Sequence, residues 1–273
     1  MNGFMLGMLA ETSVHPGAGR SQGVIDLPVS REAATDFPVI PGTSLKGTLR
    51  SKAEHERNQE FAERIFGKQD SAGAVGVTDA RLLLLPVRSL TGHSRWITCP
   101  YLLERFVRDL GLIGEEKPLP EWKIAKFDAL VAEGEEVLFL EELSFKTVVN
   151  RSIIEELSEL LAPLIRHESV RKRLPEQLVV LHDDAFTHFA RYALPVAARN
   201  SLDDKTKKST NLWYEEMLPP DCLFYALFLV RPGKEEELTK LKEHLSESIH
   251  VQVGGNETVG QGWMITQIVE GAQ

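Results

Sequence analysis

Both ends of this 273-residue chain show the same order of expected elements, an apolar strand, a charged helix and a further strand. Short continuous apolar runs are typical of buried strands, and a 3.6-residue apolar period indicates a helix. Near the beginning we expect a strand at 4–12, a helix at 44–66 and a strand at 76–87. Near the end we expect a strand at 222–230, a helix at 234–247 and strands at 249–253 and 263–269. This order predicts an α+β fold.

The middle of the chain is less regular. Helices are expected at 101–112, 152–161, 170–174 and 183–191, and short strands at 137–140, 145–149 and 178–181. From 195 to 221 the chain turns polar and basic between prolines. Because strand–helix–strand order recurs at both ends of the chain, the two halves resemble ferredoxin-like units.

Composition excludes several classes of protein. The formal net charge is −9, so the overall field does not favour coating of nucleic acid, and a polyanion needs a localised basic surface. Two cysteines, Cys99 and Cys222, are too few for a disulfide framework and lack metal-ligand spacing. No apolar run approaches the roughly 20 residues of a membrane-spanning helix, and the first residues lack the basic start of a secretory signal. We therefore expect a cytoplasmic protein without membrane contact.

The run 41–50, PGTSLKGTLR, opens the first expected helix after a long polar loop. Thr43 or Ser44 can cap the helix, and free N–H groups at a helix start attract anions such as phosphate. Lys46 and Arg50 lie four residues apart and therefore share one face. A neighbouring apolar stripe can bury the helix and comprises Leu45, Leu49 and Ala53. The alternative is an ordinary amphipathic helix with solvated basic residues.

Two loops carry many glycines or prolines. The loop at 13–43 shows no helical period, and a loop of this length usually serves function or is mobile. The run 254–262, GGNETVGQG, precedes the last strand, and its glycines allow close approach to a neighbouring chain or a phosphate. Taken alone, this run fits any tight loop.

Two parts of the sequence together resemble the RAMP proteins of CRISPR systems. They are the PGTSLKGTLR helix near the start and the GGNETVGQGW run near the end. Within that superfamily, HPGAGRSQGVIDLPVSRE at 15–32 and NLWYEEMLPPDCLFY at 211–225 resemble the Cmr-type (type III-B) backbone subunit. The resemblance covers essentially the whole chain, and the middle third is the least distinctive part.

The resemblance implies one RAMP domain over 1–273 with a modified RRM/ferredoxin-like palm, formed by 1–90 and 222–273. It implies an inserted helical region at about 91–194 and a thumb-like hairpin at about 195–221. Such subunits polymerise along a guide RNA, and the thumb disrupts the guide–target duplex at regular intervals, where target RNA is cut. The implied partners are guide RNA, single-stranded target RNA, copies of the same chain and other Cmr-type subunits. The aromatic motifs of RRM proteins are not evident, so we expect recognition of phosphates and shape.

The resemblance also implies a catalytic aspartate at the position of Asp26, because the matching family segment requires one for target cleavage. A carboxylate there can accept the proton of an attacking 2′-hydroxyl or place a divalent ion, Mg²⁺ or Mn²⁺. We predict transesterification, which leaves a cyclic phosphate and a 5′-hydroxyl. His15 is a second candidate, because its ordinary pKa of about 6.5 suits proton transfer, and Arg20 can neutralise phosphate charge. Without the family match, Asp26 is simply a solvated loop residue.

The segment around Lys205, Lys207 and Lys208 fits a thumb that crosses RNA, although such clusters are often only solvated loops. Trp213 and Tyr214 are candidates for a wedge against a base or for an anchor at the thumb base. A weaker hypothesis is that Glu215 or Glu216 joins the cleavage centre from a neighbouring subunit.

The run at 182–184, His-Asp-Asp, suggests a metal site, but helix capping by Asp183 or Asp184 is the simpler interpretation. Two alternative functions stay open at this point. One is a catalytically inactive filament subunit that binds guide RNA, and the other is a metal-independent RAMP enzyme that trims guide precursors.

Overall fold

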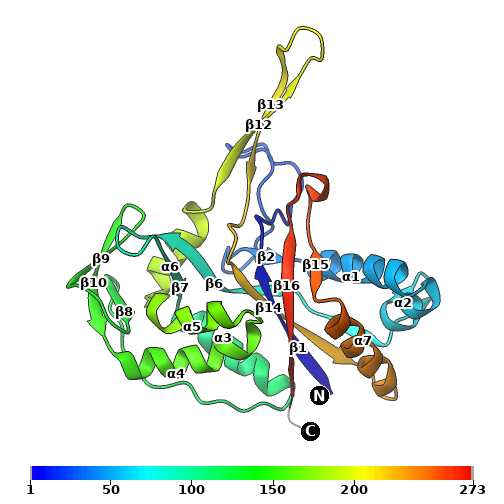
Figure 1. Cartoon of the computed structure of the whole chain (residues 1–273), viewed down its shortest axis with the longest axis horizontal. Coiled ribbons are helices and arrows are strands. Elements are labelled where there is room, and N and C mark those ends of the chain that lie inside the picture. The colour runs from blue at the N-terminus through cyan, green and yellow to red at the C-terminus, as the bar shows by residue number, and fades with distance from the viewer. Residues whose placement is uncertain (1, 272–273) are drawn as a thin grey trace.

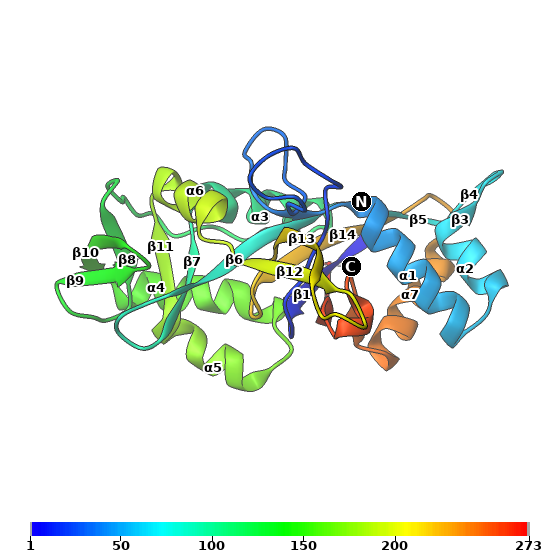
Figure 2. The ribbon, with the colours of Figure 1, turned by 90° about the horizontal axis from the view of Figure 1, so that it is seen from above.

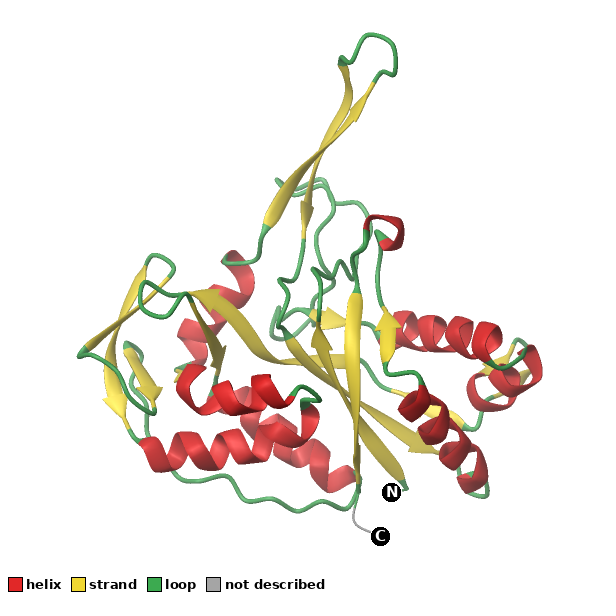
Figure 3. Cartoon of the chain, in the orientation of Figure 1, coloured by secondary structure: helices red, strands yellow, loops and turns green. Residues whose placement is uncertain are grey.

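A computed structural model describes residues 2–271 of the chain. Figures 1 and 3 show its elements. The strands are β1 (Gly3–Ala10), β2 (Val39–Ile40), β3 (Gly67–Lys68), β4 (Ser71–Ala72), β5 (Val75–Val77), β6 (Ala80–Arg88), β7 (Ser94–Thr98), β8 (Asp128–Val131), β9 (Val137–Leu140), β10 (Leu143–Val149), β11 (Leu178–Leu181), β12 (Val196–Leu202), β13 (Ser209–Glu216), β14 (Leu223–Val230), β15 (His250–Gln252) and β16 (Trp263–Glu270). The helices are α1 (Gly42–Glu56), α2 (Gln59–Phe66), α3 (Pro100–Leu112), α4 (Arg151–Leu161), α5 (Glu168–Gln177), α6 (Asp183–Tyr192) and α7 (Glu235–Glu247), with 3₁₀ turns η1 (Ala162–Leu164) and η2 (Glu257–Val259).

The two ends of the chain meet near one edge of one large sheet. Its strand order is β15-β16-β1-β14-β6-β7-β11-β8-β10-β9, with β2 and β5 paired to β6 and β14. The first strand lies between the two late strands and is antiparallel to both, so that Leu6 faces Ala226 of β14 and Ile268 of β16. Phe4 stacks on Phe228 with ring centroids 4.7 Å apart. These contacts confirm the α+β fold and join the two predicted halves in one core.

The first expected helix is two helices in the structure. The chain breaks after α1, because the side chain of Asn58 accepts a hydrogen bond from the N–H of Phe61 and starts α2. As predicted, the helical segment ends at Phe66, and the next residue, Gly67, has a φ of 86° in the left-handed region that favours glycine. The predicted apolar stripe of Leu45, Leu49 and Ala53 is buried.

The middle of the chain contains the expected helices and extends the sheet. Strands β7 and β8 were not predicted, and β7 joins β6 to the parallel strand β11. The region at 91–194 is therefore a lobe of helices and strands and not a purely helical insertion. Seen from above, this lobe lies at one end of an elongated molecule, with α1, α2 and α7 at the other end (Figure 2).

A long hairpin, β12–β13, projects from the body between these two ends (Figure 1). Its strands pair antiparallel from Val196↔Glu216 to Leu202↔Ser209. At the tip, Oδ1 of Asp203 accepts hydrogen bonds from the N–H groups of Lys205 and Thr206. The predicted thumb-like hairpin is thus present.

None of the helices within residues 2–271 is long and apolar enough to cross a bilayer. Cys99 and Cys222 are both buried, and no disulfide joins them. Burial raises the pKa of both thiols well above the usual range, so they stay protonated core residues.

Candidate active site

The loop between β1 and α1 is held against the base of the hairpin (Figure 1). Val14 and Leu218 exchange two backbone hydrogen bonds of 3.0 and 2.8 Å. Within the loop, the N–H of Ser30 donates to the carbonyl of Pro16 at 2.7 Å. The loop therefore has a defined path that brings its predicted site residues to the thumb base.

Asp26 lies where this loop runs beside β13. The N–H of Leu27 donates to the carbonyl of Tyr214 at 3.0 Å, and the N–H of Glu216 donates to the carbonyl of Leu27 at 3.0 Å. Oδ2 of Asp26 accepts the N–H of Tyr214 at 2.8 Å. The side chain is half-buried, and its other oxygen has no hydrogen-bond partner within residues 2–271. One carboxylate oxygen is thus fixed and the other is available to a ligand.

A cavity of about 350 Å³ opens at this point. It is lined by Arg20, Ser21, Asp26, Leu27, Asn211, Leu212, Trp213, Glu215 and Asn256. Two predicted site residues, Arg20 and Asp26, therefore share one cavity, which combines a cation, a carboxylate and the half-buried ring of Trp213. This combination suits a phosphodiester with an adjacent base.

Glu215 forms the inner wall of the cavity and is 3% exposed. Its Oε1 accepts a hydrogen bond from Nδ2 of Asn256, and its Oε2 lies 3.5 Å from Nε of Arg199. Sequence reasoning did not single out Asn256, although it lies in the predicted glycine-rich loop and has a left-handed φ of 63°. Because Glu215 is engaged on both oxygens, it shapes the cavity and is not a second free carboxylate.

His15 is not among the residues that line this cavity. The ring is 8% exposed, and Nδ1 donates to the carbonyl of Glu216 at 2.7 Å. Gly254 packs against its backbone, where a Cβ would lie only 2.4 Å from the His15 carbonyl oxygen. The glycine-rich run thus approaches another segment of the same chain closely, while its predicted approach to a neighbouring chain or a phosphate stays a prediction. These contacts favour a structural role for His15 over proton transfer.

A buried ion pair fixes the loop to the hairpin. Oε1 of Glu216 lies 2.7 Å from Nη2 of Arg31, and Oε2 accepts the N–H of Val29 at 3.0 Å. Arg31 also donates to the carbonyl of Ala190 at 2.8 Å. We call Arg31, Val29 and Glu216 the loop clasp. Sequence reasoning gave Glu216 only a weak catalytic role and missed Arg31.

The start of α1 differs from the prediction. Neither Thr43 nor Ser44 caps the helix. Instead, the N–H of Gly42 donates to Oδ1 of Asp79 at 2.6 Å. A carboxylate therefore already occupies part of the site at which free N–H groups were expected to attract phosphate.

Within residues 2–271, Lys46 is the one lysine or arginine of α1 without a carboxylate partner. Arg50 pairs with Glu54, with Nε 2.9 Å from Oε1, and Arg57 pairs with Glu247. Lys46 is half-buried and has no carboxylate within 4.0 Å in this part of the chain. Lys46 is thus available to an external anion, and Arg50 is partly neutralised.

The tip of the hairpin is basic and exposed. Lys205, Lys207 and Lys208 form no ion pair within the described residues. Along the shaft, Leu212 and Tyr214 are 55% and 44% exposed. Exposed apolar and cationic side chains on a projecting hairpin suit contact with bases and phosphates.

The described residues do not form a preformed metal site. No group of three His, Cys, Asp or Glu side chains between residues 2 and 271 is placed to hold an ion. The cavity offers one free oxygen of Asp26, since Glu215 is engaged. This donor set fits only a mode in which Mg²⁺ is held by one carboxylate together with substrate phosphates.

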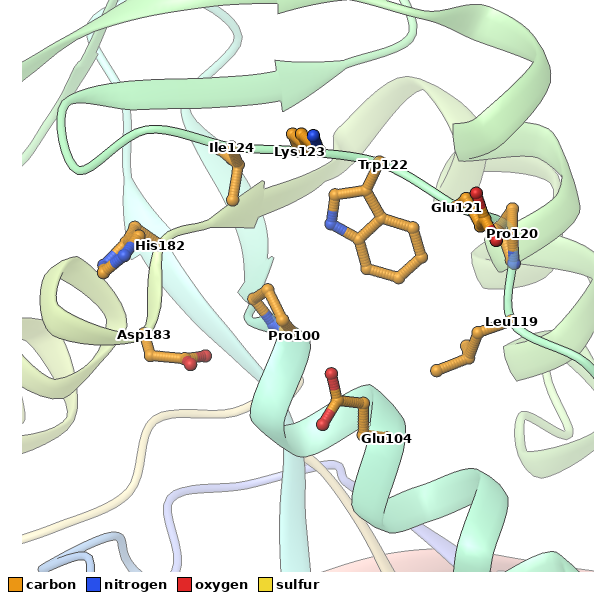
Figure 4. A pocket seen from close by; sticks show the side chains of 10 residues that line it. All are labelled: Pro100, Glu104, Leu119, Pro120, Glu121, Trp122, Lys123, Ile124, His182 and Asp183. Carbon is orange, nitrogen blue, oxygen red and sulfur yellow. The ribbon is translucent and has the colours of Figure 1, made fainter.

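A larger cavity of about 780 Å³ lies beside α3 and the start of α6 (Figure 4). Its lining is Pro100, Glu104, Leu119, Pro120, Glu121, Trp122, Lys123, Ile124, His182 and Asp183. Nδ1 of His182 accepts the N–H of Asp184 at 3.2 Å, and Oδ1 of Asp183 accepts the N–H of Tyr101 at 3.0 Å. His182 thus caps α6 and Asp183 caps α3. None of the predicted RNA-binding or catalytic residues lines this cavity.

Residues 8–265 match the RAMP superfamily. The CRISPR system Cmr endoribonuclease Cmr4 of Pyrococcus furiosus is 34% identical over 286 residues, which cover 99% of this chain and 97% of that protein. The crystal structure of oligomeric Cmr4 from Pyrococcus furiosus superposes with a TM-score of 0.82 at 30% identity and covers 100% of both chains. A chain in the cryo-EM structure of the type III-B Cmr-beta complex bound to cognate target RNA has the same fold, with a TM-score of 0.75 at 20% identity over 98% of this chain and 97% of that chain.

Proposed function

This chain belongs to the RAMP superfamily and, within it, to the Cmr4 proteins, and from that premise we propose that it is an RNA-guided endoribonuclease. In this proposal it polymerises along a guide RNA as the backbone of a Cmr-type complex and cuts complementary target RNA at regular intervals. The similarity to an endoribonuclease and to an oligomeric structure over whole chains supports both parts.

The observation that carries the proposal is the placement of Asp26. Asp26 pairs with β13 near the base of the projecting hairpin and lines a cavity together with Arg20, and one of its carboxylate oxygens has no hydrogen-bond partner within residues 2–271. A hairpin that separates paired strands would expose a sugar–phosphate linkage at its base. The carboxylate and the guanidinium are then positioned to act on that linkage.

The chemistry that fits one free carboxylate is transesterification. Asp26 accepts the proton of the 2′-hydroxyl while the 2′-oxygen forms a bond to phosphorus and the bond from phosphorus to the 5′-oxygen breaks. The leaving 5′-oxygen takes a proton from water. Arg20 contributes positive charge beside the phosphate, where negative charge builds up in the transition state. His15 has no part in this proposed step, because it does not line the cavity and its Nδ1 donates to the carbonyl of Glu216.

As the alternative to the general-base role, we propose that the free oxygen of Asp26 holds a divalent ion, Mg²⁺ or Mn²⁺, only together with the RNA. Such an ion would polarise the scissile phosphate when bound. The free chain should therefore leave the electron paramagnetic resonance spectrum of Mn²⁺ unchanged, and the RNA-bound complex should alter it. Tight Mn²⁺ binding by the free chain would contradict this.

The proposed function is tested with the assembled complex and a complementary target RNA. We expect cuts at a constant spacing whose products carry a 2′,3′-cyclic phosphate and a 5′-hydroxyl. End-labelling and mass spectrometry distinguish these ends. Products with a 5′-phosphate would contradict transesterification, and a bound but uncut target would identify the inactive filament subunit instead.

Lys46→Glu should weaken guide-RNA binding about 10- to 100-fold for all guide sequences, because a charge-assisted contact contributes about 1.5–3 kcal/mol. The slope of log affinity against log salt should fall by about 0.7 to 1. Lys172→Glu is the matched control, since Lys172 is exposed on α5 and already pairs with Glu168. Equal affinities of Lys46→Glu and wild type at moderate salt would refute the contact.

A further inference from the structure

A third cavity, of about 560 Å³, lies between α1, the edge strand β15 and the neighbouring strand β16. Its lining is Gly47, Thr48, Ser51, Lys52, His55, Glu56, His250, Gln252, Glu257 and Trp263. We call it the α1–β15 cavity. Nothing in the sequence analysis assigned a role to its aromatic residue, Trp263.

Trp263 is held in place by its backbone while its indole remains accessible. Its N–H donates to Oγ1 of Thr12 at 3.1 Å, and its carbonyl accepts the N–H of Glu11 at 2.8 Å. Trp263 pairs directly with Gln252 across the sheet, so both side chains lie on the same face. The residue is nevertheless 40% exposed. An accessible indole on a well-anchored backbone in a concave wall suits stacking on a flat ligand.

The α1–β15 cavity is adjacent to the candidate active site. The glycine-rich loop separates the two, because Asn256 lines the active-site cavity and the next residue, Glu257, lines this one. Lys46, the free cation of α1, immediately precedes Gly47 in its wall. The cavity that holds Trp263 is therefore bordered by the glycine-rich loop of the candidate active site and by the helix that carries Lys46.

The charges of the cavity do not suit a phosphate. Nζ of Lys52 lies 2.6 Å from Oε1 of Glu56 and also donates to Ser248 at 2.6 Å, so this cation is already paired. Glu257 adds a negative charge.

The polar groups of the cavity suit a neutral partner instead. Nε2 of Gln252 donates to the carbonyls of Gly254 and Gln261, which leaves its oxygen as an acceptor. Thr48 and Ser51 contribute hydroxyls, and His250 is exposed. These groups can hydrogen-bond the edge of a neutral ring that stacks on the indole.

We propose that the α1–β15 cavity binds one unstacked nucleobase of the RNA, with Trp263 stacked on its face. The inference rests on the proposed RNA-binding function and adds a base contact to the phosphate contacts. Base–aromatic stacking is tolerant of sequence, as a protein that accepts any guide requires.

The test compares single-stranded RNA with an oligomer of the same length and charge that lacks all bases. Trp263→Ala in the full chain should weaken binding of normal RNA about 5- to 150-fold, the usual effect of losing one stacked base. Binding of the abasic oligomer should not change. Trp263→Phe keeps an aromatic ring and should bind normal RNA with most of the wild-type affinity. Trp122→Ala, which alters the larger cavity of Figure 4, should bind RNA like wild type.

Three results would overturn the inference. An equal loss for normal and abasic RNA would show that Trp263 acts on the backbone path or on the fold, and Trp263→Phe would share that loss. Unchanged RNA binding with loss of self-association in sedimentation would assign the cavity to a second copy of the chain. Unchanged RNA binding and self-association would leave the cavity without this role. In each case, wild-type cleavage of target RNA would still support the proposed function.

Discussion

Asp26→Asn should slow target cleavage about 10²- to 10⁴-fold, the usual contribution of a positioned general base, and leave guide-RNA binding unchanged. The substitution is nearly isosteric, and the amide oxygen can still accept the N–H of Tyr214, which lies 2.8 Å from the carboxylate. The loop therefore keeps its position and only the basicity of the side chain is lost. Cleavage rates of the assembled complex under single turnover measure the effect.

Asp26→Ala removes the acceptor as well as the base, so it should lose cleavage and also loosen the contact with β13. Neither Mg²⁺ nor Mn²⁺ should restore activity to either variant. Asp36→Asn is the matched control, because Asp36 lies in the same loop and pairs on the surface with Arg191. Regularly spaced cuts by Asp26→Asn at the wild-type rate would remove the catalytic role.

Glu216→Ala should lower the free energy of unfolding by about 3–5 kcal/mol, the usual cost of removing one partner of a buried ion pair. The side chain of Glu216 is 5% exposed, and its loss leaves Arg31 without its carboxylate partner and the N–H of Val29 without its acceptor. Because the loop clasp fixes the loop that carries Asp26, cleavage should fall as well, although Asp26 itself is intact. Urea unfolding followed by circular dichroism measures the stability.

Glu243→Ala provides the comparison for this variant. Glu243 is exposed on α7 and makes no ion pair within residues 2–271, so its removal should change stability by less than about 0.5 kcal/mol. Glu216→Gln keeps an acceptor for the N–H of Val29, so its free energy of unfolding should lie between those of Glu216→Ala and Glu243→Ala. Equal stabilities of Glu216→Ala and Glu243→Ala would show that the clasp does not hold the loop.

Strands at the two ends of the chain could be predicted because their apolar runs are long. Strand β14 is eight residues of almost uninterrupted apolar side chains and is buried over most of its length. In contrast, β7 begins with Ser94 and Arg95, and β8 has only four residues. Short strands with a polar start carry little periodicity, so both were missed. Tertiary pairing with β6 and β11 determines them.

The candidate site could be predicted only in part. Asp26 and Lys46 lie in local motifs that the sequence displays, and the structure places Asp26 in a cavity. Asp26 and Tyr214 are 188 positions apart, and Glu215 and Asn256 are 41 apart, so no local pattern shows these contacts. The ion pair of Arg50 with Glu54 follows helical spacing and could have been foreseen.

The most direct measurement is a structure of the assembled complex on a target that carries 2′-fluorine at each cleavage position. The 2′ substituent then marks the place of the attacking hydroxyl without reaction. We predict that a carboxylate oxygen of Asp26 lies within hydrogen-bond reach of that position, about 2.6–3.2 Å or through one water. A carboxylate that points away from the scissile linkage, with no bridging water, would contradict the assignment of this chain as the nuclease.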